Sequence, residues 1–395
     1  MYLCPDCGSA NDNQPLKGVL KIVYDFSTLK KKLSREIFLQ LIPGRPWLYP
    51  ELWPFRDMKS IIHQPVLERL ILPAHSVFQI NVDGRSVLIL DETRNPTFSY
   101  KDRASIIVAL KAIESGVSEL SVASTGNAGS SLAGIASRLG LVANIWVPDI
   151  IPPQKLLQIQ AYGARVHLVD GSYDNAFDLN RRVSASCKWY DRNTAYNPLT
   201  IEGKKSAAYD IFISLRGRLP GNIIIPVGDG AIIGGIYKGF SELLSLGWID
   251  RLPRLIAVQA SGSDALFRYI NIQKFEYLPP KTIADGICAG APRNLYMAST
   301  AVKESHGLVI RVSDAEILDA QKELACHQGY LVEPAAAASL AGWRKLISNH
   351  QTGPDHKSLL LLTGNGLKDT ESVRNWIKPL KAKSIDEWKE YYSIN

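Results

Sequence analysis

The spacing of hydrophobic residues predicts two series of strands that alternate with helices. The first series has short apolar runs at residues 120–123, 143–147 and 165–169. The second series follows residue 203 and has apolar runs at residues 223–227, 254–259 and 358–362. Such alternation is typical of parallel sheets joined by crossover helices. We therefore predict an α/β fold with two lobes and a site between them, at the carboxyl ends of the strands.

The same pattern divides the chain into three parts. We expect residues 1–72 to form an accessory N-terminal segment and residues 105–197 a smaller, mobile lobe. A larger lobe would combine residues 73–104 with residues 198–395. In its first part, residues 77–90 alternate around Asp83-Gly84 and predict a hairpin.

The N-terminal segment has weaker signals. Residues 20–24 alternate like a short strand, and residues 29–41 have helical spacing that ends at a Pro-Gly-Arg-Pro sequence, residues 43–46. An aromatic run follows at residues 47–55, and such a run usually packs at a surface or an interface.

Lys101 stands where a loop gives way to a helical pattern. Apolar residues recur at spacings of three and four from residue 106 to residue 113, so a helix should begin close to Lys101, with Ser99 as its cap. Phe98 and Tyr100 would reduce the hydration of the amine and favour its neutral form, as an imine-forming nucleophile requires. Taken alone, Lys101 is more simply interpreted as a solvated surface lysine.

Two turns strengthen the case for a functional lysine. A Ser-Thr-Gly-Asn sequence at residues 124–127 lies between an apolar run and a small-residue helix at 128–139, where exposed backbone N–H groups can hold a carboxylate. The run at 223–227 ends in a glycine-rich loop, residues 228–235, which permits close approach of a phosphate. A dinucleotide site is the competing interpretation, but the Gly228-x-Gly230-x-x-x-Gly234 spacing is one residue too long for its fingerprint.

Composition and charge indicate a globular protein that acts on small molecules. The 395 residues are 46% hydrophobic and 21% charged, which is ordinary for a globular protein with two lobes. No apolar run approaches the ~20 residues of a membrane span, and the polar N-terminus does not resemble a signal peptide, so we expect no membrane partner and a cytoplasmic location. The formal charge of +7 is scattered along the chain, which favours small anionic substrates over nucleic acid.

The cysteines give weak support for a metal. Only Cys4 and Cys7 have the spacing of a metal knuckle, and a structural zinc site needs about four ligands, usually from a second such pair. No second pair follows, so we expect no metal here, with a metal shared between chains as the alternative.

Several motifs, taken in order, resemble those of threonine synthases, which are fold type II (tryptophan synthase β-like) pyridoxal phosphate enzymes. These motifs lie at residues 95–103, 124–127, 228–235, 333–335 and 362–369. They match in order and spacing along about three quarters of the chain. The resemblance implies the two-lobed fold type II architecture, with pyridoxal phosphate bound by the large lobe, and a homodimer.

The resemblance also implies a role for each motif. Lys101 would hold the cofactor as a Schiff base and later remove the α-proton of the substrate. Asn127 would bond the phenolic oxygen of the cofactor, and Thr363 would face the pyridine nitrogen. The cofactor phosphate would bind Val227, Gly228, Asp229, Gly230 and Ala231. The substrate carboxylate would bind Ser124, Thr125 and Gly126.

The sequence departs from the family on the substrate side. Threonine synthases usually hold the phosphate of O-phosphohomoserine with polar residues where this chain has Ala128, Ile232 and Thr200. The family's Asn-Ser pair corresponds to Thr194-Ala195, its Gly-x-Thr-Pro-Leu motif before the lysine loop is missing, and Asp229 stands where asparagine is common. Glu333 fits either a wall of the site or a helix cap.

These departures predict an elimination or replacement at Cβ or Cγ of an amino acid, with an altered substrate-phosphate site. One alternative is threonine synthase itself, which converts O-phosphohomoserine to threonine and phosphate. A second alternative is a non-catalytic homologue that regulates a partner.

Overall fold

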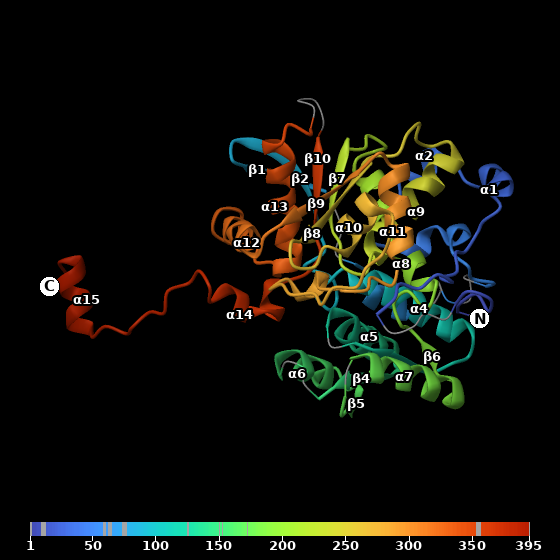
Figure 1. The fold of residues 1–395 in the computed structure, drawn as a ribbon, viewed down its shortest axis with the longest axis horizontal. Coiled ribbons are helices and arrows are strands. Elements are labelled where there is room, and N and C mark those ends of the chain that lie inside the picture. Colours follow the sequence, from blue (N-terminus) through green and yellow to red (C-terminus); the bar gives the residue numbers. More distant parts are fainter. Residues whose placement is uncertain are drawn as a thin grey trace.

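The computed structural model of the chain describes residues 2–8, 13–57, 61, 65–72, 77–124, 126–149, 151, 153–171, 173–352 and 357–394. Thr125 lies outside the described residues. Two sheets form the centre of two lobes, with the larger lobe above the smaller one in Figure 1. None of the described helices is long and apolar enough to cross a membrane.

The larger sheet has six strands in the order β1-β2-β10-β7-β8-β9. Its strands are β1 (Phe78–Val82), β2 (Arg85–Asp91), β7 (Asn222–Pro226), β8 (Arg254–Ala260), β9 (Leu308–Val312) and β10 (Ser358–Leu362). The β1–β2 hairpin is antiparallel, as predicted, and the other pairs are parallel. The sequence prediction found all of these strands except β9.

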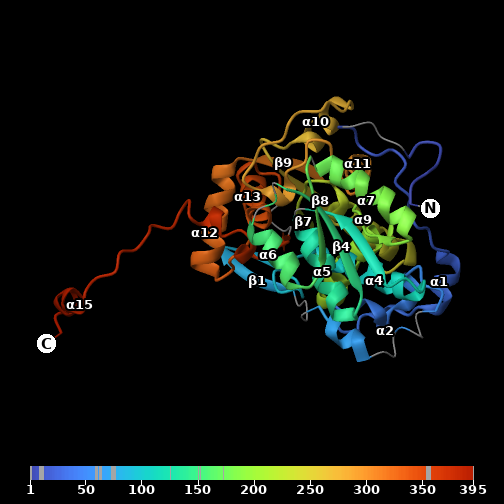
Figure 2. The same ribbon diagram turned by 90° about the horizontal axis from the view of Figure 1, so that it is seen from below.

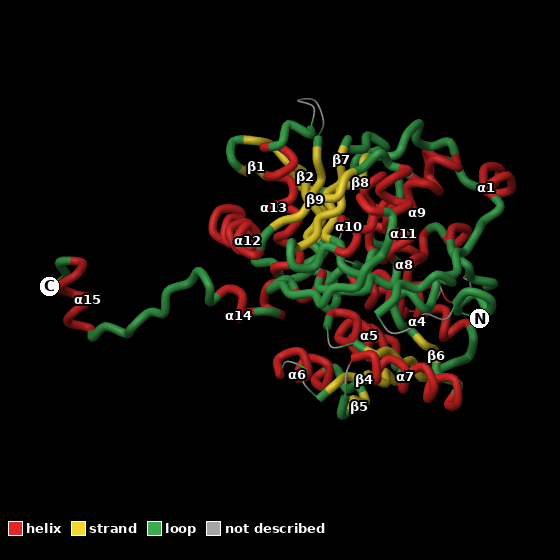
Figure 3. The backbone as a smooth tube through the Cα atoms, viewed as in Figure 1, coloured by secondary structure: helices red, strands yellow, loops and turns green. Residues whose placement is uncertain are grey.

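The smaller sheet has four parallel strands in the order β5-β4-β3-β6. They are β3 (Glu119–Ala123), β4 (Val142–Pro148), β5 (Arg165–Val169) and β6 (Tyr190–Asp191). Helices α5 and α6 contact one side of this sheet and α7 contacts β3 and β4, so strands and helices form the layers predicted from the alternating pattern. Figure 3 shows the two groups of strands separated by helices and loops.

Helices account for most of the remaining chain. The α-helices are α1 (Phe26–Lys32), α2 (Arg35–Phe38), α4 (Lys101–Glu114), α5 (Asn127–Leu139), α6 (Pro153–Ala161), α7 (Tyr173–Cys187), α8 (Leu199–Ser214), α9 (Ala231–Leu246), α10 (Ala265–Ile272), α11 (Leu295–Glu304), α12 (Asp314–Gln328), α13 (Pro334–Ser348), α14 (Thr370–Val373) and α15 (Ile385–Tyr392). Short 3₁₀ turns are η1 (Pro46–Leu48), η2 (Pro50–Leu52), η3 (Pro65–Leu70), η4 (Asp285–Ile287) and η5 (Gly366–Lys368).

The central strands of the larger sheet are buried on both faces. Because side chains alternate across a strand, Leu359 and Leu361 of β10 face one core, with α8, α9 and α11, while Leu360 and Leu362 face another, with α12 and α13. Each fully buried leucine contributes about 1.5 to 3 kcal/mol. Two-sided burial explains why these strands are continuous apolar runs instead of alternating ones. Figure 2 shows the helices on both sides of the strands.

The N-terminal segment differs from its prediction in two places. Residues 20–24 form no strand, and only an isolated bridge joins Leu3 to Val19. The helix predicted over 29–41 is two short helices, α1 and α2, because the chain turns extended at Leu33 and Ser34, and the Ser34 side chain caps α2.

The aromatic residues of this segment are buried inside the large lobe. Tyr49 and Trp53 stack at 5.6 Å between ring centroids, and Tyr49 also meets Tyr209 of α8 edge to face at 5.3 Å. Phe38 packs on Trp248 at 4.9 Å. The segment is therefore part of the core of the lobe, whereas the sequence pattern alone favoured a surface or an interface.

The chain ends in an arm that extends away from both lobes (Figure 1). Its helix α15 has no buried residue. The arm contributes nothing to the site described next.

Candidate active site

Lys101 is the first residue of α4, as predicted from the change of pattern. The Tyr100 N–H donates to the Thr363 carbonyl oxygen at 2.9 Å, and Ser99 bridges Gly364, so the lysine loop is joined to the end of β10. The prediction that Ser99 caps the helix is wrong: the cap position is Tyr100, and the Ser99 hydroxyl has no hydrogen-bond partner in the described part of the chain. The backbone pairing with Gly364 fixes the loop instead.

The two residues after Lys101 anchor the start of the helix. The Asp102 carboxylate accepts the Thr97 hydroxyl at 2.5 Å and the Thr97 N–H at 2.7 Å, which closes the preceding loop. Arg103 is fully buried between Glu92 and Asp210, with a nitrogen 2.7 Å from a carboxylate oxygen of each. Because a buried charge without partners is very costly, these bonds hold α4 in one position relative to β2 and α8.

The electrostatics around Lys101 suit an amine that must become neutral. Burial of the Lys101 amine, with a smaller contribution from the charge of Arg192, lowers its pKa below the ordinary value. The carboxylates of Asp229 and Glu333 oppose this shift. The lowered pKa increases the fraction of free amine near neutral pH, and the free amine is the form that reacts with a carbonyl group.

Asn127 and Glu333 connect the two lobes. Asn127 begins α5, and its side-chain N–H donates to Glu333 Oε2 at 2.7 Å. The Glu333 N–H in turn donates to the Gly364 carbonyl oxygen at 3.0 Å. A Cβ at Gly364 would lie 1.9 Å from Glu333 Oε2, so only glycine permits this arrangement. Burial raises the pKa of the Glu333 carboxyl, partly offset by Lys368.

The glycine loop forms a cradle at the start of α9. Gly230 has a φ of +83°, and a Cβ there would lie 2.8 Å from the Asn294 carbonyl oxygen. A Cβ at Gly228 would lie 2.8 Å from the Ile287 Cα. No described side chain caps α9. Its first backbone N–H groups therefore remain available to bind an anion.

Asp229 is the exposed residue of this loop. Its side chain accepts the Arg293 backbone N–H at 3.4 Å, and its carbonyl oxygen accepts the Asn294 N–H at 2.9 Å. The carboxylate is therefore tied to the neighbouring loop. The Asp229 backbone N–H is part of the cradle. The Asp229 side chain lines the cavity, and its negative charge raises the pKa of Lys101.

The Ser-Thr-Gly-Asn turn follows β3. Ser124 accepts the Gly126 N–H at 3.2 Å, and Gly126 occupies the cap position of α5, where no described side chain caps the helix. The predicted carboxylate ligand Thr125 lies outside the described residues. The described part of the turn thus has a helix N-terminus that faces the cavity, as a carboxylate site requires.

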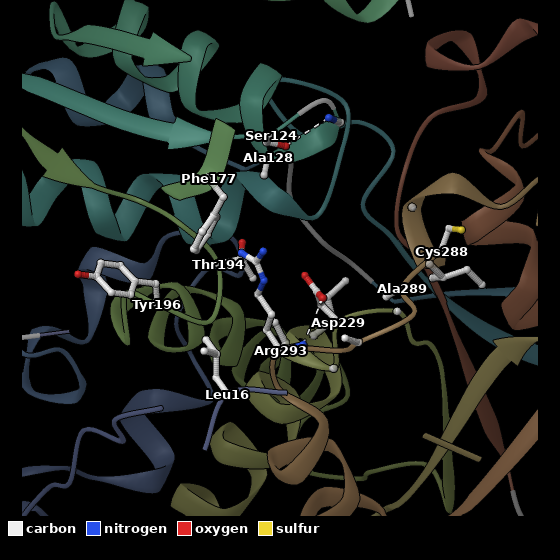
Figure 4. Close-up of a pocket in the computed structure, with 18 of the residues that line it drawn as sticks. Leu16, Ser124, Ala128, Phe177, Thr194, Tyr196, Asp229, Cys288, Ala289 and Arg293 are labelled. Atoms are coloured by element: carbon white, nitrogen blue, oxygen red, sulfur yellow. Dashed lines mark hydrogen bonds between the residues drawn. The ribbon is translucent and has the colours of Figure 1, made fainter. Parts of the chain in front are cut away.

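One cavity of about 930 Å³ brings the predicted site residues together. Its lining includes Lys101, Ser124, Gly126, Asn127, Val227, Gly228, Asp229, Gly230, Ala231 and Thr363. They come from the ends of β3, β7 and β10 and from the starts of α4, α5 and α9. Figure 4 shows part of this lining, with Ser124 and Ala128 on one side and Asp229 and Arg293 on the other.

The cavity also contains residues that the sequence interpretation did not place there. Arg293 and Arg181 line it, and so do Tyr2, Leu3 and Leu16 of the N-terminal segment. No local motif marks these positions, because they reach the cavity only through long-range packing. Among the described residues no group of three or more His, Cys, Asp or Glu side chains could hold a metal ion.

The residues present fit pyridoxal phosphate. A phosphate requires the cradle that side chains at Gly228 and Gly230 would fill, and a carbonyl group on the cofactor requires the amine of Lys101. The buried Asn127 side-chain oxygen has no hydrogen-bond partner among the described residues, so these residues do not use the amide fully. This combination defines an enzyme of the pyridoxal phosphate class.

Comparison with known proteins shows the family. The chain belongs to the pyridoxal-phosphate dependent enzymes, whose family model matches residues 71–364, and it is a threonine synthase-like member of fold type II. It is 33% identical to the threonine synthase of Methanocaldococcus jannaschii over 394 residues, covering 96% of this chain and 95% of that one. It is 38% identical to the threonine synthase of Synechocystis sp. over 341 residues, covering 86% and 85%.

Solved structures share the fold. The processed form of threonine deaminase isoform 2 from Solanum lycopersicum superposes with a TM-score of 0.65 at 18% identity, covering 85% of this chain and 97% of that one. Maize serine racemase superposes with a TM-score of 0.65 at 20% identity, covering 83% and 96%. The predicted fold class is therefore confirmed, and the family model confirms the predicted cofactor.

Proposed function

We propose that this enzyme catalyses elimination or replacement at Cβ or Cγ of an amino acid, with Lys101 as the catalytic base. The observation that supports the proposal most is the convergence of Lys101, Asn127, Thr363 and the glycine cradle on one cavity. Keeping all of these groups, together with a lowered Lys101 pKa, is difficult to explain for a non-catalytic regulator.

Each residue has a distinct task in this proposal. Pyridoxal phosphate, when bound, supplies an electron sink for the substrate Cα. Lys101 holds the cofactor and, once its amine is free, removes the α-proton. Asn127 orients the ring through the phenolic oxygen, and Val227, Gly228, Asp229, Gly230 and Ala231 hold the phosphate. Ser124, Thr125 and Gly126 hold the substrate carboxylate.

Thr363 determines which reactions are favoured. With pyridoxal phosphate bound, the neutral Thr363 hydroxyl would face the pyridine nitrogen and would not keep it protonated, as an aspartate would. A cofactor held in this way would be a weaker electron sink, which would favour elimination and replacement over transamination. Thr363 lies at the end of β10, and its carbonyl oxygen fixes the residue before Lys101.

The substrate side supports a changed leaving group. Ala128 and Ile232 bring only apolar side chains to the cavity. The Thr200 hydroxyl is fully buried and donates to the Asn197 carbonyl oxygen at 2.8 Å, so it is used within the protein. Each lost hydrogen bond to a charged group costs roughly 1.5 to 3 kcal/mol.

Three cations of the large lobe are candidates for replacing the lost donors: Lys204, Lys205 and Arg94. The Lys204 ammonium is buried and donates to the Thr200 carbonyl oxygen at 3.2 Å. Lys205 is buried with its ammonium 2.7 Å from Glu202 and 2.9 Å from Glu242. Arg94 pairs with Asp91 at 3.0 Å. Lys205 and Arg94 are therefore paired with neighbouring carboxylates.

Threonine synthase is the second candidate. It is favoured by the identities of 33% and 38% to proteins of that name over most of both chains. The two candidates differ in one measurable property, which is turnover of O-phosphohomoserine to threonine and phosphate.

The test is a substrate screen with the purified protein and its cofactor. Amino acids with a leaving group at Cβ or Cγ are added singly, and both cofactor absorbance and products are measured. We expect slow or negligible threonine release from O-phosphohomoserine and faster turnover of another substrate. Threonine release at roughly 1 per second or faster would establish threonine synthase instead. A protein that turns over no amino acid would overturn the proposal.

Two further expectations belong to this proposal. We propose a homodimer, and a small lobe of residues 105–197 that moves relative to residues 73–104 and 198–395 when substrate binds. Light scattering of the purified protein tests the first expectation. Small-angle scattering with and without a substrate analogue tests the second.

A further inference from the structure

The first residues of the chain form part of the wall of the cavity. The lining residues from this segment include Tyr2, Leu3, Cys4, Pro5 and Gly8. The Tyr2 ring meets Tyr190 of β6, in the smaller sheet, edge to face at 6.4 Å between centroids. Farther along the segment, the Ile22 carbonyl oxygen accepts the Lys238 ammonium of α9 at 2.7 Å. The segment therefore joins the smaller sheet to the large lobe along one side of the cavity.

Two cysteines, Cys4 and Cys7, stand on either side of a tight turn in this wall. The chain turns at residues 5–7, and the Cys4 N–H donates to the Gly18 carbonyl oxygen at 2.9 Å. A Cβ at Gly18 would lie 2.3 Å from the Gly8 Cα, so the end of the turn packs directly on the returning chain. The position of Cys4 in the wall is therefore tied to the backbone at Gly18.

The two thiols are placed for mutual reaction. The Cys7 thiol hydrogen-bonds to the Cys4 side chain, and this bond, together with the backbone N–H groups of Cys7 and Asp6, lowers the pKa of the Cys4 thiol. The same contact raises the pKa of Cys7. Cys7 is exposed, and Cys4 is half-buried at the cavity. A C-x-x-C pair with one stabilised thiolate and one accessible thiol has the arrangement of pairs that exchange with disulfides.

A metal ion is the competing ligand for such a pair. A structural zinc site needs about four ligands. Within the described ranges of the chain, no group of three or more His, Cys, Asp or Glu side chains could hold a metal ion, so these residues supply at most two ligands at the turn. Both thiols are free. This favours redox chemistry of the pair over a metal centre.

We propose that Cys4 and Cys7 form a reversible disulfide in the wall of the cavity, and that this disulfide slows the access of small molecules to the cofactor. The oxidant is a small disulfide such as oxidised glutathione. The Cys4 thiolate attacks one of its sulfurs, a bond forms between the two sulfurs, and one glutathione thiolate leaves. The Cys7 thiolate then attacks the Cys4 sulfur and displaces the second glutathione thiolate. The two cysteine protons pass through solvent to the two glutathione thiolates, so the pair is oxidised and one glutathione disulfide is reduced.

The effect on access follows from the place of the turn. A disulfide removes the conformations in which Cys4 and Cys7 are apart. The turn is itself part of the wall, and the chain that returns beside it brings Leu16 to the same cavity, as Figure 4 shows. A fixed turn therefore restricts the opening movements of this side of the cavity.

The test equilibrates the holoenzyme with mixtures of reduced and oxidised glutathione, before and after treatment with a metal chelator. Peptide mapping by mass spectrometry identifies the state of the two cysteines. Access is measured as the rate at which hydroxylamine removes the cofactor, followed by absorbance. The variants are Cys7→Ser and the double variant Cys4→Ser/Cys7→Ser.

Cys326→Ser is the matched control. Cys326 is also exposed, but it lies on α12 and has no cysteine at C-x-x-C spacing. We expect this variant to show the same disulfide and the same hydroxylamine rates as the wild type in every glutathione mixture.

The expected result is a disulfide within the one peptide that contains Cys4 and Cys7. The hydroxylamine reaction of the oxidised enzyme should be slower by about 3- to 10-fold, a part of the constraint that a disulfide places on a chain segment, and reduced glutathione should restore the rate. Cys7→Ser should accumulate glutathione on Cys4, because the second thiol is missing. The double variant should react with hydroxylamine at one rate under all conditions.

Three results would overturn the proposal. The first is failure of Cys4 and Cys7 to form an intramolecular disulfide in oxidised glutathione. The second is an oxidised enzyme whose hydroxylamine rate equals that of the reduced enzyme. The third is zinc that is bound stoichiometrically before chelation and is lost in the double variant, which would identify the two cysteines as metal ligands.

Discussion

Gly230→Ala tests whether the glycine loop is the cofactor-phosphate cradle. The residue has a φ of +83°, and a new Cβ would lie 2.8 Å from the Asn294 carbonyl oxygen and 2.9 Å from the Ala298 Cβ. The left-handed conformation costs an alanine about 1 to 2 kcal/mol. The overlap with a backbone oxygen adds about 1 to 3 kcal/mol, or shifts the loop by a few tenths of an ångström.

Gly247→Ala is the matched control at the other end of the same helix. Gly247 has a φ of +76°, but a Cβ there would have no neighbour within 4 Å. It should show only the conformational cost of about 1 to 2 kcal/mol. Gly230→Ala should therefore destabilise the apoprotein by about 2 to 5 kcal/mol in urea unfolding and, because the cradle moves, weaken cofactor binding at least tenfold.

The measurements separate stability from binding. Urea midpoints of the apoproteins give the folding cost, and titration with pyridoxal phosphate gives the dissociation constant. Gly247→Ala should bind the cofactor like the wild type. If both variants bound the cofactor with wild-type affinity, or if both lost affinity equally, the assignment of the loop would be refuted.

Other predictions concern the neighbours of the cofactor. Because burial lowers the pKa of Lys101, cofactor uptake by the apoprotein should increase as pH rises through a midpoint below the usual lysine value; a midpoint at the usual value would contradict this. Asp229 opposes that shift, so Asp229→Asn should move the midpoint lower still, as followed by absorbance against pH. The lowered pKa also means that folding favours the neutral form of Lys101. The free energy of unfolding should therefore increase as pH rises from the pKa of Lys101 in the folded state to its higher pKa in the unfolded chain. Thr363→Ala should retain the cofactor but change its spectrum and reduce the rate, whereas unchanged spectra and rates would exclude a contact with the pyridine nitrogen.

The fold was largely predictable because buried parallel strands are continuous apolar runs. The run at 358–362 became β10, and the hairpin around Asp83-Gly84 was also found. Strand β9 was missed because Arg311 interrupts its apolar residues at the edge of the sheet, where only one neighbour is present. The prediction of one continuous helix over residues 29–41 was wrong, because Ser34 caps a second helix within this helical pattern.

The candidate site was predictable where local sequence supplies the chemistry. Lys101 and Gly230 owe their positions to a helix start, which sequence patterns indicate. Arg293 was not predictable because its place in the cavity depends on the Asn294 to Asp229 bond and on Phe177 from the other lobe. The prediction of Ser99 as a helix cap was wrong, because the geometry of its loop is set by a backbone bridge to Gly364, which is distant in the sequence.

Borohydride reduction of the holoenzyme tests the central claim most directly. If Lys101 holds pyridoxal phosphate, reduction should fix the cofactor covalently, and peptide mapping by mass spectrometry should find it on the peptide that contains Lys101. Lys101→Ala should give no labelled peptide and no turnover, with Lys111→Ala, on the same helix, as a control that labels like the wild type. Cofactor attached to another lysine, or a protein that takes up no pyridoxal phosphate, would contradict the account.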